Sequence, residues 1–283
     1  MALRRAPRSR RDPLKLDLSI RQPSALPVLP AIATSVLSLA NNPSADAADL
    51  SDLIHQDQTL AGNVLRIANS PAYRTGDAIV SLRQAVLQLG FSVLSEIAVA
   101  ACLNADAFRA PGFEPLRKRL LAHAFVTGGF AKELARRKRR NVEALFLCGL
   151  LHSVGRTVAL RLVAEAHAGA AERPAEADVL PVLDAHEAEL GARVTAAWNL
   201  PPQVQTAAAH HRAPEQAPAF VDETRTVALA AALATWGLQD AAHDEAVVRT
   251  LPAWAGLNYY PDEVDAVLER RPALLEAAAI FLA

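Results

Sequence analysis

Histidines carry most of the chemistry that this 283-residue sequence could perform. Imidazole nitrogens bind transition metals and transfer protons near neutral pH. Five histidines lie in or beside apolar helical stretches, namely His123, His152, His186, His210 and His211. Several helices that direct imidazoles inward could build a metal site. A single histidine on an apolar helix face is more often a neutral core residue bonded to a carbonyl, and this alternative stays open for each of them.

One stretch, residues 143 to 156, is central to this question. Its apolar run from Ala144 to Leu151 leads to His152, and Ser153 follows directly. We expect the helix to break at Gly155, and Arg156 to open the next, more basic helix. A histidine at the end of such an apolar helix points either into a packed core or into a pocket.

Composition limits the classes of protein. The chain is 52% hydrophobic with a formal net charge of -1, which excludes disorder for most of it and argues against bulk attraction to nucleic acid or to an anionic membrane. The longest apolar stretch, 227 to 238, is shorter than the roughly 20 residues that cross a bilayer. We therefore expect a cytoplasmic protein without a membrane span, in which Cys102 and Cys148 are buried, reduced thiols.

Alanine and leucine at helical spacing predict a nearly all-helical protein. Ser44 or Asp46 is expected to cap one helix and Asp57 the next, and Gly90 should end a third. A polar loop is expected from Gly169 to Asp178. The longer helices that we predict after the break at Pro111 span 116–138, 142–152, 180–198 and 203–211.

Several motifs resemble the bacterial HDOD domain, and they occur in the same order as in that family. They are Leu-Pro-Val-Leu-Pro at 26–30, Leu-Arg-Ile-Ala-Asn-Ser-Pro at 65–71, Gln-Ala-Val-Leu-Gln-Leu-Gly at 84–90, Phe-Leu-Cys-Gly-Leu-Leu-His at 146–152, Trp-Asn-Leu-Pro at 198–201 and His-His at 210–211. The resemblance covers about residues 21 to 214. It implies an all-helical relative of the HD metal phosphohydrolases that serves as a signalling output module.

The resemblance also implies a damaged metal site. The first histidine of the HD pattern matches His123, and the His-Asp pair matches His152 and Ser153. A later histidine falls at Glu187, and the last aspartate falls at Ala231. Hydrolases of this kind use carboxylates to hold hard cations and an activated water, which a serine and an alanine cannot do.

His123, His152, Glu187 and His210 are then expected to line a remnant pocket between two helical lobes. Ser153 and His211 are further candidates, although one residue is about 100° of helix rotation, so we expect only one of His210 and His211 to face it. No catalytic residue, metal or cofactor is assigned. Three histidines and a glutamate could still hold Zn²⁺, which keeps a phosphohydrolase with altered ligands as the alternative.

The sequence therefore predicts a regulatory, non-catalytic HDOD module. A flexible basic tail is expected at 1–20, an HDOD domain at 21–218 with lobes 21–110 and 111–218, and C-terminal helices at 219–283 that pack on the second lobe or form a homodimer interface. The expected partners are signalling proteins or a small regulatory ligand. A nucleic-acid binder that uses the N-terminal arginines and the basic run 136–140 is a third hypothesis, although a helix C-terminus accounts equally well for that run.

Overall fold

Helices form the regular structure of the chain. The computed structural model describes residues 26–27, 31–40, 42, 44–69, 73, 76–103, 108–168, 173–239 and 245–282. Within these residues there is no strand, which confirms the all-α prediction. The predicted basic tail at 1–20 lies outside the described residues and stays a prediction.

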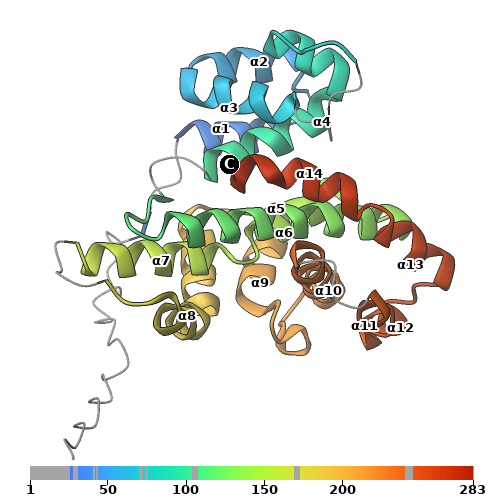
Figure 1. Cartoon of the computed structure of the whole chain (residues 1–283). Helices are drawn as coiled ribbons and strands as arrows, with labels where there is room; N and C mark the ends of the chain where they lie inside the picture. Colours follow the sequence, from blue (N-terminus) through green and yellow to red (C-terminus); the bar gives the residue numbers. More distant parts are fainter. Residues whose placement is uncertain are drawn as a thin grey trace, which may run out of the picture.

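Four helices form the first group, at the top of Figure 1. They are α1 (Ala31–Ala40), α2 (Ala47–His55), α3 (Gln58–Ala68) and α4 (Leu82–Leu103). Asp46 caps α2 through a capping box, and the Asp57 carboxylate accepts the backbone N–H of Leu60 at 3.0 Å, both as predicted. Gly90 has a φ of 82°, a conformation that glycine adopts without strain, and there α4 bends.

The remaining helices form a second group around one long helix. That helix is α5 (Glu114–Arg137), and α14 (Arg271–Leu282) lies along it, between α5 and the first four helices (Figure 1). The others are α6 (Val142–Leu151), α7 (Val154–Ala166), α8 (Glu176–Ala197), α9 (Pro202–His210), the 3₁₀ turn η4 (Pro214–Gln216), α10 (Val221–Leu238), α11 (Glu245–Arg249), α12 (Pro252–Gly256) and α13 (Pro261–Leu268).

Two predicted boundaries are wrong. The chain breaks at His152 and Ser153, between α6 and α7, and Gly155 lies inside α7. Helix α8 begins at Glu176, so part of the expected loop is helical. Glu176 and Asp178 occupy its first turn, where negative charge complements the helix dipole and makes the polar sequence compatible with a helix start.

The basic run at the end of α5 forms ion pairs with two later helices, α10 and α13. Lys138 binds the carboxylate of Glu263 at 2.6 Å and lies 4.6 Å from the ring centre of Tyr259. Arg140 pairs with Asp222 at 2.8 Å. These contacts hold α10 and α13 against the end of α5 and engage two of the five cations of the run.

A buried ion pair joins the two groups of helices. Lys132 of α5 contacts both carboxylate oxygens of Glu96 of α4, at 2.7 and 2.6 Å, and the two side chains are only 17% and 7% exposed. The indole N–H of Trp198, at the end of α8, donates to the carbonyl of Pro27, which precedes α1, at 2.9 Å. The junction between the groups is therefore polar as well as apolar.

The most apolar helical stretch lies in the core. By length and hydropathy, Val142–Ala166 could cross a membrane, but 78% of its apolar window is buried inside the protein. Among the residues that the structure describes, a second such stretch arises only if the two halves of α4, bent by 117°, are taken together. Cys148 of α6 is buried as predicted, and burial raises the pKa of its thiol to about 12. The side chain of Cys102 lies outside the described residues.

Candidate functional site

Close helix packing brings two predicted histidines together. A Cβ atom on Gly149 of α6 would lie 2.8 Å from the Cα of Gly128 of α5, so only glycine allows this approach of the two backbones. His123 lies on α5 and His152 at the C-terminal end of α6, and their ring centres are 5.5 Å apart. Packing between glycines thus positions the first half of the site.

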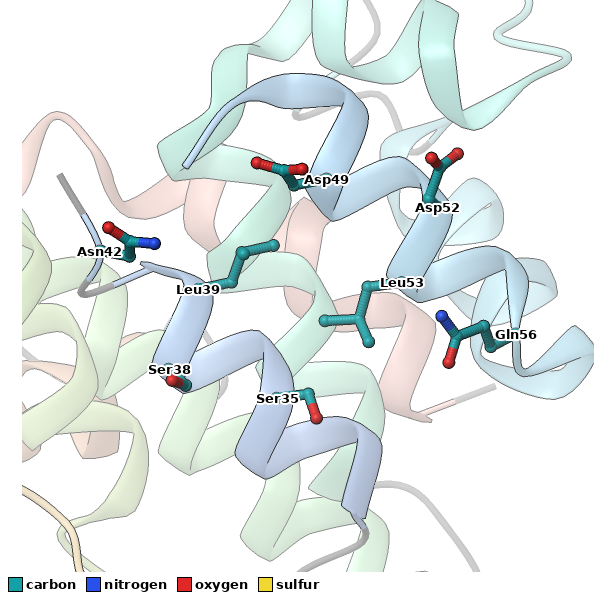
Figure 2. A pocket seen from close by; sticks show the side chains of 8 residues that line it. All are labelled: Ser35, Ser38, Leu39, Asn42, Asp49, Asp52, Leu53 and Gln56. Atoms are coloured by element: carbon teal, nitrogen blue, oxygen red, sulfur yellow. The ribbon is translucent and has the colours of Figure 1, made fainter. Parts of the chain in front are cut away.

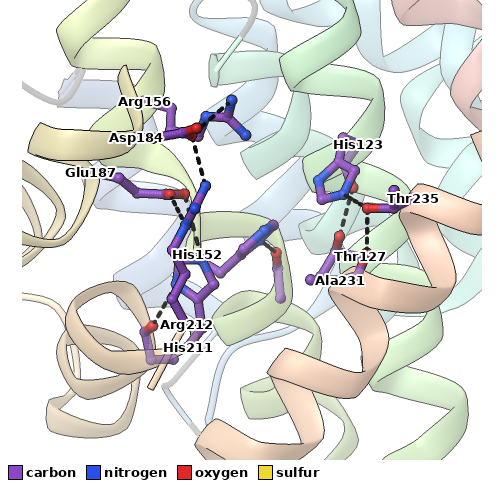
Figure 3. A network of polar contacts seen from close by, with 12 residues as sticks. His123, Thr127, His152, Arg156, Asp184, Glu187, His211, Arg212, Ala231 and Thr235 are labelled. Carbon is purple, nitrogen blue, oxygen red and sulfur yellow. Dashed lines mark hydrogen bonds and ion pairs between the residues drawn. The ribbon is translucent and has the colours of Figure 1, made fainter. Parts of the chain in front are cut away.

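A third imidazole extends the row. His211 ends α9, and its ring lies 4.8 Å from the ring centre of His152 at nearly a right angle. Figure 3 shows His211 and Arg212 close to His152. His211 lines the pocket and His210 does not, so the prediction that placed His210 there is wrong. One residue along a helix is a rotation of about 100°, which turns the two side chains in different directions.

Hydrogen bonds fix which nitrogens of two histidines carry the proton. Nδ1–H of His152 donates to the carbonyl of Gly149 at 2.6 Å, which leaves Nε2 with the lone pair. Thr235 donates its hydroxyl proton to the carbonyl of Ala231, so its oxygen accepts from Nε2 of His123 at 3.0 Å. Both rings therefore keep one acceptor nitrogen.

Glu187 of α8 faces these rings and is 1% exposed. Its Oε1 lies 3.4 Å from Nε2 of His211, and its Oε2 forms an ion pair with Nε of Arg212. Oε2 accepts no hydrogen bond from the described residues, so its contact with Arg212 is an ion pair alone. Arg212 also reaches Asp184 at 2.8 Å, and Arg156 reaches the same carboxylate at 3.2 Å (Figure 3).

Burial and charge set the ionisation of the site. Burial, with the charge of Arg156, lowers the pKa of His123 to about 4, and burial with the neighbouring imidazoles places the pKa of His152 well below its ordinary value. Burial alone would raise the pKa of Glu187, but His211, Arg212 and Arg156 outweigh it and lower the pKa. Two neutral imidazoles thus face one carboxylate.

Acid is expected to destabilise the protein through these two histidines. Because their pKa values are lower in the folded chain than in the unfolded one, about 6.5, the unfolded chain binds more protons and stability falls as the pH drops below about 6.5. We expect His123 to account for about 1–2 kcal/mol between pH 7 and pH 5. Urea unfolding of the wild type and of His123→Gln at both pH values measures this difference, and an equal loss in the two proteins would contradict it.

A pocket of about 270 Å³ opens between these side chains. His123, His152, Glu187 and His211 line it, as do Arg156, Arg212 and Thr235, which were not singled out as site residues from the sequence. Ser153 is buried beside the pocket without lining it. Ala228, Ala231 and Ala232 of α10 form one wall and leave the space open.

These residues do not fit the metal centre of an HD hydrolase. Within the described part of the chain, no three His, Cys, Asp or Glu side chains lie close enough to hold a metal ion. The Arg212 guanidinium contacts Glu187, the carboxylate that would serve as a ligand. Ala231 stands on the wall where the HD pattern has an aspartate.

A second hollow, of about 430 Å³, lies between α1 and α2 (Figure 2). Ser38, Asp49 and Asp52 are among its lining side chains. Asp49 already accepts the backbone N–H of Asp46 as part of the capping box, and Asp52 is exposed. This hollow is a surface groove of ordinary polar residues, whereas the first pocket gathers buried ionisable groups.

Comparison with known families identifies the domain. The family model of the HDOD domain matches residues 26–214. The chain belongs to the HDOD family. An uncharacterized protein of Treponema pallidum is 28% identical to this HDOD protein over 220 residues, which cover 72% of the chain and 41% of the relative. The HDOD chain thus spans about two fifths of the length that this relative has.

Solved structures share the fold of this HDOD protein. The "Putative phosphohydrolase" of Shewanella amazonensis has a TM-score of 0.69 at 22% identity and covers 92% of this chain and 96% of its own. An HDOD domain protein of Geobacter sulfurreducens has a TM-score of 0.68 at 23% identity, with coverages of 90% and 92%. The "Putative signal transduction protein" of Marinobacter aquaeolei has a TM-score of 0.64 at 21% identity, with coverages of 91% and 60%. At these identities the likeness shows the fold.

Proposed function

We propose that this HDOD protein is a non-catalytic regulatory module of the cytoplasm that acts by binding a partner protein or a small ligand. The observation that carries the proposal is the contact of the Arg212 guanidinium with the buried carboxylate of Glu187. A fixed cation at the only acidic side chain that lines the pocket, within the described residues, repels a divalent metal ion. The signalling name of one structural relative agrees with this role.

The alternative is an HD-type phosphohydrolase with altered ligands, and the names of two structural relatives favour it. This reaction needs a metal-bound water of lowered pKa. His123, His152 and His211 supply imidazoles, but the pocket contributes Glu187 alone as a carboxylate, and Arg212 holds it. The residues of the site therefore support binding better than hydrolysis.

Two measurements on one sample decide between these functions. The full chain is purified from cells grown with added Mn²⁺, Fe²⁺ and Zn²⁺, and its metal content and its turnover of bis(p-nitrophenyl) phosphate are determined. We expect substoichiometric metal. Any residual turnover should be the same in the wild type and in His152→Ala. Stoichiometric metal together with turnover lost in His152→Ala would establish the hydrolase instead.

Nucleic-acid binding has less support. Lys138 and Arg140, from the basic run, form ion pairs with Glu263 and Asp222 within the fold. Cations used in this way are less available to phosphates, whose binding depends on released counterions. A gel shift that weakens with salt and is lost on replacing Arg137 and Arg139, which are exposed at and just after the end of α5, would favour this third function.

A further inference from the structure

Opposite charges in the first pocket lie at different depths. The Glu187 side chain is 1% exposed, whereas the side chains of Arg156 and Arg212 are 21% and 50% exposed. The carboxylate therefore lies at the inner end of the pocket and the two guanidinium groups lie toward solvent. Figure 3 shows the two arginines on opposite sides of Asp184, which both of them contact.

Two buried polar atoms of the pocket side chains have unused hydrogen-bonding capacity, although one of them, on Glu187, is in ion-pair contact with Arg212. Oε2 of Glu187 and Nε of Arg156 are buried and make no hydrogen bond with the described residues. His152 keeps a lone pair on Nε2 because its Nδ1 donates to Gly149. Buried polar groups are nearly always satisfied, so these atoms call for a bound group. The inner end can accept hydrogen bonds from a ligand, and Nε of Arg156 can donate one.

Charge balance narrows the class of ligand. Two arginines face Asp184 and Glu187, so the charges of these four side chains cancel, and burial keeps His123 and His152 neutral. A phosphate dianion would meet the buried Glu187, and a metal ion would meet two guanidinium groups. Both approaches cost Coulomb energy in a poorly solvated site. A dipolar molecule without net charge can direct its positive end to Glu187 and its negative end to the arginines, so that each end also faces a group of opposite charge.

We propose that this pocket binds a small zwitterion of the α-amino acid class, with its ammonium group toward Glu187 and His152 and its carboxylate toward Arg156 and Arg212. The inference rests on the proposed function, because it names the ligand of the regulatory module. A volume of about 270 Å³ lies just below the range of drug-sized sites, about 300–1,000 Å³, which suits a ligand of this size. Arginine binds a carboxylate through two parallel hydrogen bonds.

Calorimetric titration of the full chain tests the proposal. The probes are each of the twenty common L-amino acids, with acetate, methylammonium and inorganic phosphate as single-charge and phosphate controls. We expect saturable binding and a raised Tm for at least one amino acid, and no comparable binding of the three controls. Binding of no amino acid would overturn the proposal, and so would phosphate or acetate binding as tight as any amino acid.

Two arginine variants provide the matched comparison. Arg212→Gln removes a half-exposed guanidinium from the pocket and should weaken amino-acid binding about 10-fold or more. Arg225→Gln removes a similar side chain that pairs with Glu215 away from the pocket, and should leave binding unchanged. An equal effect of both variants would contradict the site. Failure of this inference appears as absent or misplaced binding, whereas failure of the proposed function appears as bound metal and turnover.

Discussion

Replacing Gly155 by alanine is expected to destabilise the protein by about 3 kcal/mol or more. An ideal Cβ at this position lies 2.0 Å from the backbone carbonyl oxygen of Glu187 and 2.7 Å from the backbone nitrogen of Gly191. Backbone atoms cannot rotate away as a side chain can, so α7 and α8 must separate. Glu187 would move with α8, and the pocket should change together with stability.

Gly62→Ala is the matched control. Gly62 lies inside α3, is exposed, and has nothing within 4 Å of an added Cβ. There alanine should stabilise by roughly 0.5–1 kcal/mol, because glycine loses more backbone entropy in a helix. Thermal and urea unfolding of both variants measure the contrast. A Gly155→Ala protein as stable as the wild type would show that the helices do not approach as closely as described.

Replacing Lys132 by methionine is expected to cost about 3–5 kcal/mol at pH 8. The change leaves Glu96 buried as a carboxylate without its cation. Burial already raises the pKa of Glu96, and Lys132 opposes this shift. Without Lys132 the pKa rises further, so the folded variant retains a proton that the unfolded chain releases. Relative to the wild type, the variant therefore loses least stability in mild acid, and its deficit grows as the pH rises through the raised pKa of Glu96.

Urea unfolding at pH 5.5 and pH 8 checks this prediction. The double variant Glu96→Gln/Lys132→Met removes both charges and should recover much of the loss at pH 8. Arg249→Met breaks an ion pair with Asp265 whose two side chains are 41% and 54% exposed, and should barely change the midpoint. A Lys132→Met loss that does not depend on pH would show that the stem of the lysine, and not its charge, stabilises the junction.

Much of the fold could be predicted from local sequence signals. Asp46, Asp57 and Gly90 act where their types predict, because capping and left-handed turns depend on neighbours along the chain. Gly155 was misread for the opposite reason. Its role is a contact with the backbone at Glu187, and sequence spacing alone does not reveal that distant contact.

The histidines of the site could be predicted from the sequence, whereas its arginines could not. His123, His152 and Glu187 follow from the HD pattern, and all three line the pocket. Arg156 and Arg212 were missed as site residues because an arginine beside a helix end is usually solvated. Their common contact with Asp184 arises only when α7, α8 and α9 pack together. Arg212 directly follows the paired histidines, and that adjacency was the one available signal.

Helix α14 has a consequence for the order of events during synthesis. It lies along α5, between that helix and the first four helices, and its Leu274 contacts the α5 backbone at Gly129 (Figure 1). Of the described helices it is the last to leave the ribosome, while α5 emerges far earlier. The part of the α5 surface that α14 covers therefore stays exposed until α14 has been synthesised. During that time the nascent chain can aggregate or bind chaperones.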